Sequence, residues 1–308
     1  MKRSAFVLVV AALVCGGISA VQAQTQPAPS AAPSENVIVT APKARPEKAI
    51  DNYIITYATP TPGLDKLARW KVGICPVIAG LPAKAADFID KRVKRVAFLA
   101  GVPAVAEDRC RPNIAILFTP QPQVLLNFIR DRFPHLLGTH YTSQTERLTT
   151  MSHPIQAWYA TATEDLNGFL QDDDLQRDFF SAPPGSTMPG ARTMAWSGLH
   201  IRDGFRSDFT TVVIVVDSAK VGDREIGALS DYIAMLALAA TRTFDTCQNV
   251  PSITNLLSPN CDASLKVNAL TDIDLAYLHG LYKMDADGKF LLQRGSIAWQ
   301  MKKSLGGS

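Results

Sequence analysis

The sequence predicts an α+β fold in which a mixed β-sheet packs with helices, including a central apolar helix at about residues 223–242. Of the 308 residues, 47% are apolar and 19% are charged, which excludes a disordered polar chain and supplies enough apolar side chains for a core. Short apolar runs alternate with stretches of helical spacing, as in sheets covered by helices. Residues 226–240 are apolar on nearly every side, which indicates a buried helix.

An export signal is predicted at the N-terminus. Lys2 and Arg3 precede an apolar run over Ala5–Val14. Val21-Gln22-Ala23 then places small residues at the positions that a signal peptidase reads, so residues 1–23 form a predicted signal peptide. The apolar run is shorter than the roughly 18 to 20 residues of a membrane-spanning helix. We therefore expect a periplasmic or secreted protein with no membrane span in the mature chain.

The rest of the chain divides by composition into three parts. Residues 24–50 are rich in Gln, Pro, Ala, Ser and Thr, which predicts a disordered linker. Residues 51–302 have the pattern of a single globular domain, and 303–308 form a short tail. Removing Lys2 and Arg3 from the 31 basic residues leaves 29 against 28 acidic ones, a net charge of +1. This balance predicts no nucleic-acid partner.

The first half of the domain alternates strands and helices. A strand is expected within Trp70–Gly80, before Pro76, and another over the apolar run Ile114–Phe118. Pro82 opens an amphipathic helix that continues to about Leu99, and Pro122 opens a second one.

The second half continues the same pattern. Strands are expected over Ile155–Thr161, Thr193–Ile201 and Phe209–Val216, the last two joined by a turn near Asp203-Gly204. The apolar helix follows, and the last predicted helix starts with a capping box made by Thr271 and Asp274 and ends near Tyr282.

Four cysteines remain once Cys15 is removed with the signal peptide: Cys75, Cys110, Cys247 and Cys261. An even number of cysteines in an exported chain predicts disulfides. Four cysteines allow three pairings, and the simplest joins Cys75 to Cys110 and Cys247 to Cys261. The other interpretation is a four-thiolate zinc site, which the lack of any Cys-x-x-Cys pair disfavours.

The sequence contains none of the common catalytic or cofactor motifs. There is no Gly-x-Ser-x-Gly elbow, and neither glycine-rich nucleotide loop occurs. No two histidines have the i, i+4 spacing of a zinc-binding helix. We therefore expect no metal and no cofactor. The histidines are His135, His140, His153, His200 and His279.

From the strand at Phe209–Val216 onward, the order of elements resembles that of the zincin (metzincin) metallopeptidases, in which an edge strand precedes the zinc-binding helix. In that family the helix carries a His-Glu-x-x-His motif. The equivalent positions here are Ser230, Asp231 and Ala234, so the resemblance implies a zincin-like fold without its metal ligands. Ser252–Asn255 is similar to the Met-turn of the family, although it lacks the methionine.

The mature chain also resembles a family of secreted Gram-negative bacterial proteins, which implies export and no particular activity. The residues that carry this resemblance are Trp70, Cys75-Pro76, Cys110, Pro112-Asn113, Trp158-Tyr159 and the helix around Asp231.

These observations predict a non-catalytic binding or envelope-associated module whose partner is an unidentified envelope protein or ligand. The alternative is an envelope-directed hydrolase that uses a carboxylate such as Asp231, although a buried structural role is favoured for this residue. A third interpretation is a structural partner protein with an aromatic docking surface around Trp158, Tyr159 and Trp196, residue types that are more often found in cores.

Overall fold

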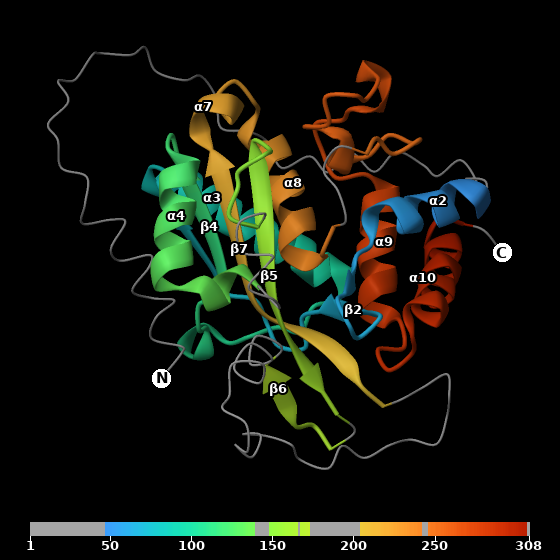
Figure 1. Ribbon diagram of the computed structural model, residues 1–308. Helices are drawn as coiled ribbons and strands as arrows, with labels where there is room; N and C mark the ends of the chain where they lie inside the picture. Colours follow the sequence, from blue (N-terminus) through green and yellow to red (C-terminus); the bar gives the residue numbers. More distant parts are fainter. Residues whose placement is uncertain (1–46, 139–147, 166, 173–203, 242–245, 307–308) are drawn as a thin grey trace, which may run out of the picture.

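The computed structural model describes residues 47–138, 148–165, 167–172, 204–241 and 246–306, which form a mixed β-sheet covered by helices (Figure 1). This arrangement confirms the α+β class. The strands are β1 (Pro60–Thr61), β2 (Lys66–Arg69), β3 (Pro76–Ala79), β4 (Ile114–Thr119), β5 (Ile155–Glu164), β6 (Leu170–Asp172) and β7 (Arg206–Asp217). The α-helices are α2 (Glu47–Tyr57), α3 (Ala83–Ala100), α4 (Pro122–Arg132), α7 (Ser218–Val221), α8 (Ile226–Leu238), α9 (Asp272–Lys283) and α10 (Phe290–Ser304), and the 3-10 helices are η1 (Glu107–Arg109), η2 (Pro134–Leu137), η5 (Ile253–Asn255) and η6 (Ala263–Leu265).

Strand β7 is the centre of the sheet. Its first part pairs in parallel with β2, its second part pairs in parallel with β4, and β5 runs antiparallel along its other side. Strand β3 lies beyond β4, β1 pairs with β2, and β6 pairs with the end of β5. Residues 212–216 of β7 are all buried, because both faces of this strand are covered.

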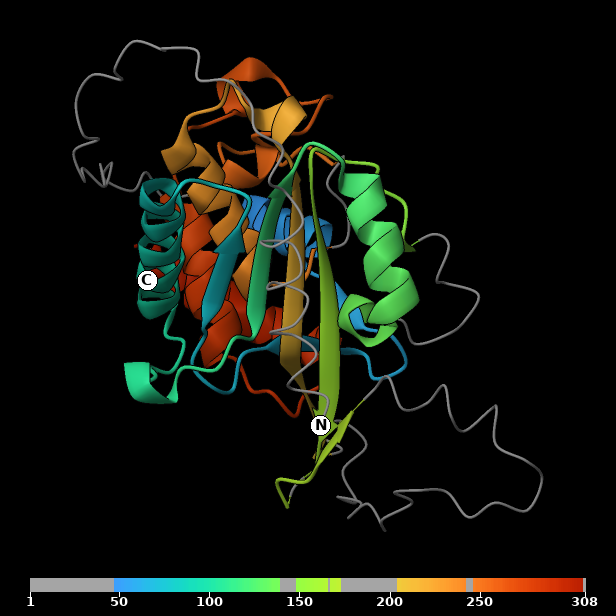
Figure 2. The same cartoon turned by 90° about the vertical axis from the view of Figure 1, so that its left-hand side faces the viewer.

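Helices cover the sheet on both faces, so the molecule has three layers (Figure 2). On one face, Val212, Ile214 and Val216 belong to a large core that includes α3 and α8, with α9, α10 and α2 behind them. On the other face, Val213 and Val215 pack with α4 and η2. The apolar helix α8 is buried almost throughout, as its composition predicts.

Most of the predicted elements are confirmed, including α3 after Pro82, α4 with Pro122 in its first turn, and α9. Both hydrogen bonds of the predicted capping box between Thr271 and Asp274 are present at the start of α9. The strand predicted before Pro76 is wrong, because β3 instead begins at Pro76. Proline is tolerated there because it is the first residue of an edge strand, where its missing N–H leaves no ladder hydrogen bond unmade.

Helix α10 is not predicted by the sequence, which places the last helix at α9. Its exposed side carries large apolar residues and its N-cap Lys289 makes no capping bond, so neither amphipathic spacing nor a start signal marks it. Helix α2 begins at Glu47, inside the predicted linker 24–50, and α10 reaches Ser304, inside the predicted tail 303–308. The predicted signal peptide and the predicted strand Thr193–Ile201 lie outside the described residues.

Both predicted disulfides are present. Cys75 and Cys110 have Cα atoms 5.6 Å apart, and Cys247 and Cys261 have Cα atoms 5.1 Å apart. The first joins the residue before β3 to the segment before β4, and the second closes a loop after α8. Disulfides of this kind are typical of proteins outside the cytoplasm. None of the helices in the described part of the chain is long and apolar enough to cross a bilayer.

Candidate functional site

Asp231, the candidate catalytic residue, lies on α8 and is only 1% exposed. Its carboxylate accepts two hydrogen bonds from Arg92 on α3, with Nε to Oδ1 at 2.5 Å and Nη2 to Oδ2 at 2.8 Å. Oδ2 also accepts the backbone N–H of Leu270 at 2.8 Å. This bidentate ion pair ties together α3, α8 and the segment before α9. The geometry therefore favours the structural interpretation of Asp231 over the catalytic one.

The two positions equivalent to zinc-binding histidines, Ser230 and Ala234, are fully buried. The Ser230 hydroxyl donates to the Ile226 carbonyl of its own helix at 2.6 Å, a bond common for serine within helices. The preceding strand β7 lies inside the sheet, whereas the zincin resemblance implies an edge strand. Among the residues that the structure describes, no group of three or more His, Cys, Asp or Glu side chains is placed to hold a metal ion.

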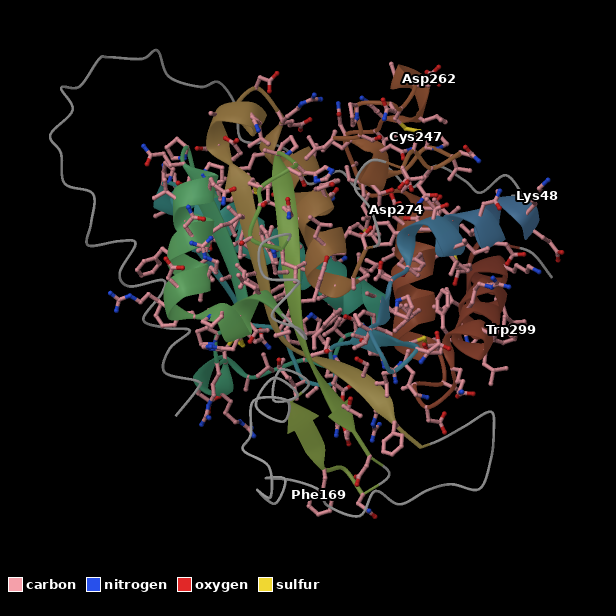
Figure 3. All side chains as sticks on the ribbon, in the orientation of Figure 1. Lys48, Phe169, Cys247, Asp262, Asp274 and Trp299 are labelled. Carbon is pink, nitrogen blue, oxygen red and sulfur yellow. A yellow bond between two sulfur atoms is a disulfide. The ribbon has the colours of Figure 1, made fainter. Side chains whose placement is uncertain are left out.

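A second buried carboxylate, Asp274, organises the region around η5 and the start of α9 (Figure 3). Oδ1 accepts the hydroxyls of Tyr53 and Ser252 at 2.7 and 2.5 Å. Oδ2 accepts the Ile253 N–H at 3.0 Å, and the N–H and hydroxyl of Thr271 at 2.9 and 2.7 Å. The sequence predicts the contact with Thr271 but not the contact with Tyr53, which lies 221 residues away. Burial, followed by the charge of Asp274, raises the pKa of the Tyr53 hydroxyl well above its usual range.

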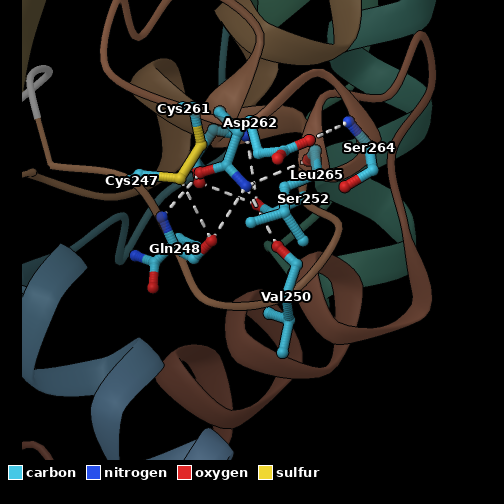
Figure 4. The surroundings of a disulfide bond; sticks show 10 residues. Cys247, Gln248, Val250, Ser252, Cys261, Asp262, Ser264 and Leu265 are labelled. Atoms are coloured by element: carbon cyan, nitrogen blue, oxygen red, sulfur yellow. Dashed lines mark hydrogen bonds between the residues drawn. A yellow bond between two sulfur atoms is a disulfide. The ribbon is translucent and has the colours of Figure 1, made fainter.

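Figure 4 shows the loop closed by Cys247 and Cys261. The buried Asn255 holds this loop from inside. Its amide oxygen accepts the Gln248 N–H at 2.7 Å. Its amide nitrogen donates to the carbonyls of Gln248, Val250 and Leu265 at 3.2, 3.0 and 3.0 Å. Asn255 is the last residue of Ser252–Asn255, the segment that resembles a Met-turn. Its hydrogen bonds give this segment a structural role.

Glu164 of β5 and Asp208 of β7 form a pair of buried carboxyl groups, where the end of β5 pairs with the start of β7. Lys71 Nζ lies 2.6 Å from each oxygen of Glu164, and Arg206 Nη2 lies 2.9 Å from Oε1. Asp208 hydrogen-bonds to Glu164, while its Oδ2 has no donor among the described residues. Two carboxyl groups can hydrogen-bond to each other only if they hold a proton between them.

The proton of this pair belongs to Asp208. Burial, then the hydrogen bond and charge of Glu164, raise the pKa of Asp208 to about 7. Burial opposes the charge of Glu164, but the Lys71 ammonium, the hydrogen bond with Asp208 and the Arg206 guanidinium together hold the pKa of Glu164 below its usual range. The sequence offers no signal for this pair, because it depends on the register of β5 against β7.

Asp208→Asn is expected to remove a pH dependence of stability. Between about pH 4 and 7 the native protein holds a proton on Asp208 that the unfolded chain has released, so stability falls as pH rises through this window. The asparagine amide imitates the protonated acid, since it donates to Glu164 at every pH. We expect the free energy of unfolding of the native protein to fall by on the order of 2 to 3 kcal/mol from pH 5 to pH 8. The free energy of unfolding of the variant should not show this decrease.

Urea unfolding of both proteins at pH 5, 6, 7 and 8 measures this difference. Glu164, whose pKa is lowered, contributes a pH dependence of opposite sign that acts below about pH 4.5 and leaves this window unaffected. Parallel stability curves for the two proteins would contradict the assignment.

A cavity lies beside β5 and is called here the β5 pocket. Its volume is about 340 Å³. One wall is the sheet surface made by β5 and Phe209, and a second is the segment Thr59–Pro62. That segment lies against the chain that leaves α8, where Thr59 N–H donates to the Ala240 carbonyl at 3.3 Å. Its described lining is Thr59, Pro60, Thr61, Pro62, Ala68, Leu137, Gly138, Leu148, Gln156, Ala157, Trp158, Tyr159, Thr161, Phe209, Ala240 and Thr241.

The third wall of the β5 pocket depends on a glycine. Gly138 has φ +60°, and a Cβ atom there would lie 1.8 Å from the Tyr159 carbonyl oxygen. Only glycine allows the end of η2 to approach β5 so closely. This contact brings the buried Leu137 into the wall of the pocket.

The described lining of the β5 pocket is uncharged and mostly apolar, with threonine hydroxyls among the aromatic and aliphatic side chains. Thr59 Oγ1 is buried and has no hydrogen-bond partner among the described residues. A buried hydroxyl without a partner is uncommon in folded proteins, which marks Thr59 as the polar residue of interest in this wall.

A second cavity of about 10 Å³, enough for one water, shares Thr241 with the β5 pocket. Tyr57 lines it, and the buried Tyr57 Oη also has no hydrogen-bond partner in the described part of the chain. Burial, with smaller effects from neighbouring tyrosines, raises the pKa of Tyr57 well above its usual range, so this hydroxyl is neutral. Thr59 in the wall of the β5 pocket and Tyr57 in the wall of the small cavity thus each carry a buried hydroxyl without a partner among the described residues.

Of the aromatic residues predicted as a docking surface, Trp158 is buried and Tyr159 is partly buried. Trp158 is 2% exposed and its indole N–H donates to the Leu148 carbonyl. Tyr159 donates to the Ala239 carbonyl at 3.3 Å and stacks on Phe209. Trp196 and two of the histidines, His140 and His200, lie outside the described residues.

Comparison with protein-family models, with curated proteins and with solved structures found no match to this chain.

Proposed function

We propose that this protein is an exported, non-catalytic module that binds a small, uncharged and largely apolar molecule in the β5 pocket. The supporting observation is a cavity of about 340 Å³, uncharged along its described lining, whose wall includes Thr59, a residue with a buried hydroxyl that has no partner among the described residues. Ligand pockets commonly have volumes of roughly 300 to 1,000 Å³ and combine apolar walls with a few polar groups. A ligand with one hydroxyl, amide or carbonyl group fits this chemistry.

Periplasmic or secreted location is part of the proposal. It is supported by the two disulfides and by the signal-peptide pattern of residues 1–23. The proposal takes from the zincin resemblance only the order of β7, α8 and α9. It needs no metal ligands, because a binding role does not require a metal.

The hydrolase alternative has weaker support at Asp231. The described hydrogen-bond partners of Asp231 are Arg92 and the Leu270 N–H, and neither is a nucleophile or a second acid. General acid–base catalysis needs a carboxyl group that can reach a substrate proton. A carboxylate engaged on both oxygens inside the core does not meet this requirement.

Filling the β5 pocket is expected to weaken ligand binding strongly without unfolding the protein. Nile red, an uncharged dye whose emission shifts to the blue in apolar surroundings, serves as the probe. We expect saturable binding by the native protein and at least about tenfold weaker binding by Ala157→Phe, because the added ring occupies the cavity. The control Val124→Phe adds a ring at an exposed position on α4, outside the pocket, and is expected to bind as the native protein does.

Circular dichroism and the unfolding temperature verify that both variants are folded. Unchanged dye binding by a folded Ala157→Phe protein, or no saturable binding by the native protein, would contradict the proposed function.

A further inference from the structure

The β5 pocket reaches around the edge of the sheet. Strand β5 is the outermost long strand on the side of β7 away from β2 and β4 (Figure 2). The pocket lining includes Leu137 and Trp158, which belong to the core on one face of the sheet. It also includes Ala68 and Phe209, which belong to the core on the other face. A cavity that touches side chains of both faces lies beside the edge between them, so β5 presents this edge to the pocket.

The hydrogen-bond pattern shows which backbone groups of β5 face outward. Opposite residues of antiparallel strands alternate between pairs that exchange hydrogen bonds and pairs that do not. The Asp217 N–H donates to the Pro154 carbonyl at 2.8 Å, which makes this a bonded pair. Three residues further along the register, Ala157 opposite Ile214 is a pair of the other kind. The N–H and C=O of Ala157 therefore point away from β7, towards the outer edge.

The outer edge of β5 is open at Ala157. Among the described strands, β6 pairs with this edge only at Ala162–Glu164, and no described residue outside the sheet forms a backbone hydrogen bond with Ala157. Two residues further on, Gly138 lies against the Tyr159 carbonyl and ends the open stretch. Proteins often protect such edges with charged residues, yet β5 carries none before Glu164. An open edge of this kind is a template for an additional strand.

Two properties of the site specify its ligand. The outward N–H and C=O of Ala157 form a donor–acceptor pair, which an extended peptide matches with its own C=O and N–H. The described lining of the pocket carries no charge, so it favours an uncharged ligand. The segment Thr59–Pro62 and Leu137 form walls beside the edge, so the space suits one extended chain better than the edge of a second sheet.

We propose that the ligand of the β5 pocket is a short, uncharged peptide segment that binds in extended conformation as an added strand, paired with Ala157. Main-chain hydrogen bonds to the strand edge select a peptide, and its apolar side chains contact lining residues such as Phe209. The inference rests on the proposed function, because it names the class of molecule that the same pocket binds.

The capped tripeptide acetyl-Val-Thr-Val-amide is the probe. We expect it to bind the native protein saturably in isothermal titration calorimetry and to displace Nile red. The same peptide with N-methyl groups on all three residues keeps the side chains but lacks the N–H groups of those residues. It should bind at least about tenfold more weakly, because the Ala157 carbonyl loses its donor and the methyl groups hold the two chains apart.

Ala157→Pro is the matching change in the protein. Because the Ala157 N–H points outward, proline there removes no hydrogen bond of the sheet, and circular dichroism should show a folded protein. This variant should bind the tripeptide at least about tenfold more weakly than the native protein does. The control Val124→Pro lies in the first turn of α4, where proline is tolerated, and should bind the tripeptide as the native protein does.

The outcomes separate this inference from the proposed function. Saturable binding of Nile red together with no binding of the tripeptide would overturn the inference and leave the proposed function standing. Equal affinity of the methylated and unmethylated peptides, or native affinity in a folded Ala157→Pro protein, would have the same meaning. If neither Nile red nor the tripeptide binds saturably, both proposals are wrong.

Discussion

Asp274→Ala is expected to reduce the free energy of unfolding by about 4 to 6 kcal/mol. The substitution removes the common acceptor of the Tyr53, Ser252 and Thr271 hydroxyls and of two backbone N–H groups. Each buried donor that loses its acceptor costs about 1 to 3 kcal/mol, and little water can reach a group that is fully buried. The loss exceeds that of a helix cap alone, which is typically about 1 kcal/mol.

Urea unfolding at pH 7, followed by tryptophan fluorescence, measures this loss. Asp272→Ala is the matched control, because Asp272 is in the first turn of the same helix but only partly buried. We expect the control to lose less than about 1 kcal/mol through the helix dipole. If Asp274→Ala is too unstable to purify, Asp274→Asn retains one acceptor oxygen and should fall between the two. Equal stability of the two alanine variants would show that the Asp274 network does not stabilise the fold.

Asp231→Ala is expected to destabilise the protein by about 3 to 5 kcal/mol, because it leaves the Arg92 guanidinium largely buried without its counter-charge. The same helix α3 supplies the control. Lys91 and Asp87 form an exposed i,i+4 pair at 2.8 Å, and Asp87→Ala should cost less than about 0.5 kcal/mol.

A double-mutant cycle with Arg92→Ala separates the ion pair from other losses at Asp231. We expect a coupling energy of about 2 kcal/mol or more, since the pair is bidentate and largely buried. A coupling below about 0.5 kcal/mol would mean that Asp231 acts independently of Arg92 and would return it to the list of catalytic candidates.

The sequence predicts those parts of this fold that depend on local signals. Prolines at helix starts, the capping box of Thr271 and Asp274, and the all-round apolar composition of α8 each act over a few residues. The disulfide pairing also follows from the sequence, because each bond closes a loop within its own region.

The remaining features depend on contacts between distant segments. Tyr53 reaches Asp274 only because α2 packs across the start of α9, and Asp208 meets Glu164 only in one register of β5 against β7. The described lining of the β5 pocket comes from seven separate stretches of the chain, none of which has a sequence motif. Helix α10 escapes prediction because one of its outward faces is apolar. The proposed function attaches to one of these features, the β5 pocket.

The chain is synthesised from its N-terminus, and the central position of β7 determines when the sheet can be completed. Strands β2, β4 and β5 all precede β7 in sequence, yet each has β7 as a neighbour. Until residue 217 has emerged, the earlier strands expose unpaired edges, and β4 in particular is an apolar strand with one side open. Such edges favour aggregation and slow folding. A folding helper that shields the first two hundred residues would therefore matter more for this chain than for one whose strands pair in order.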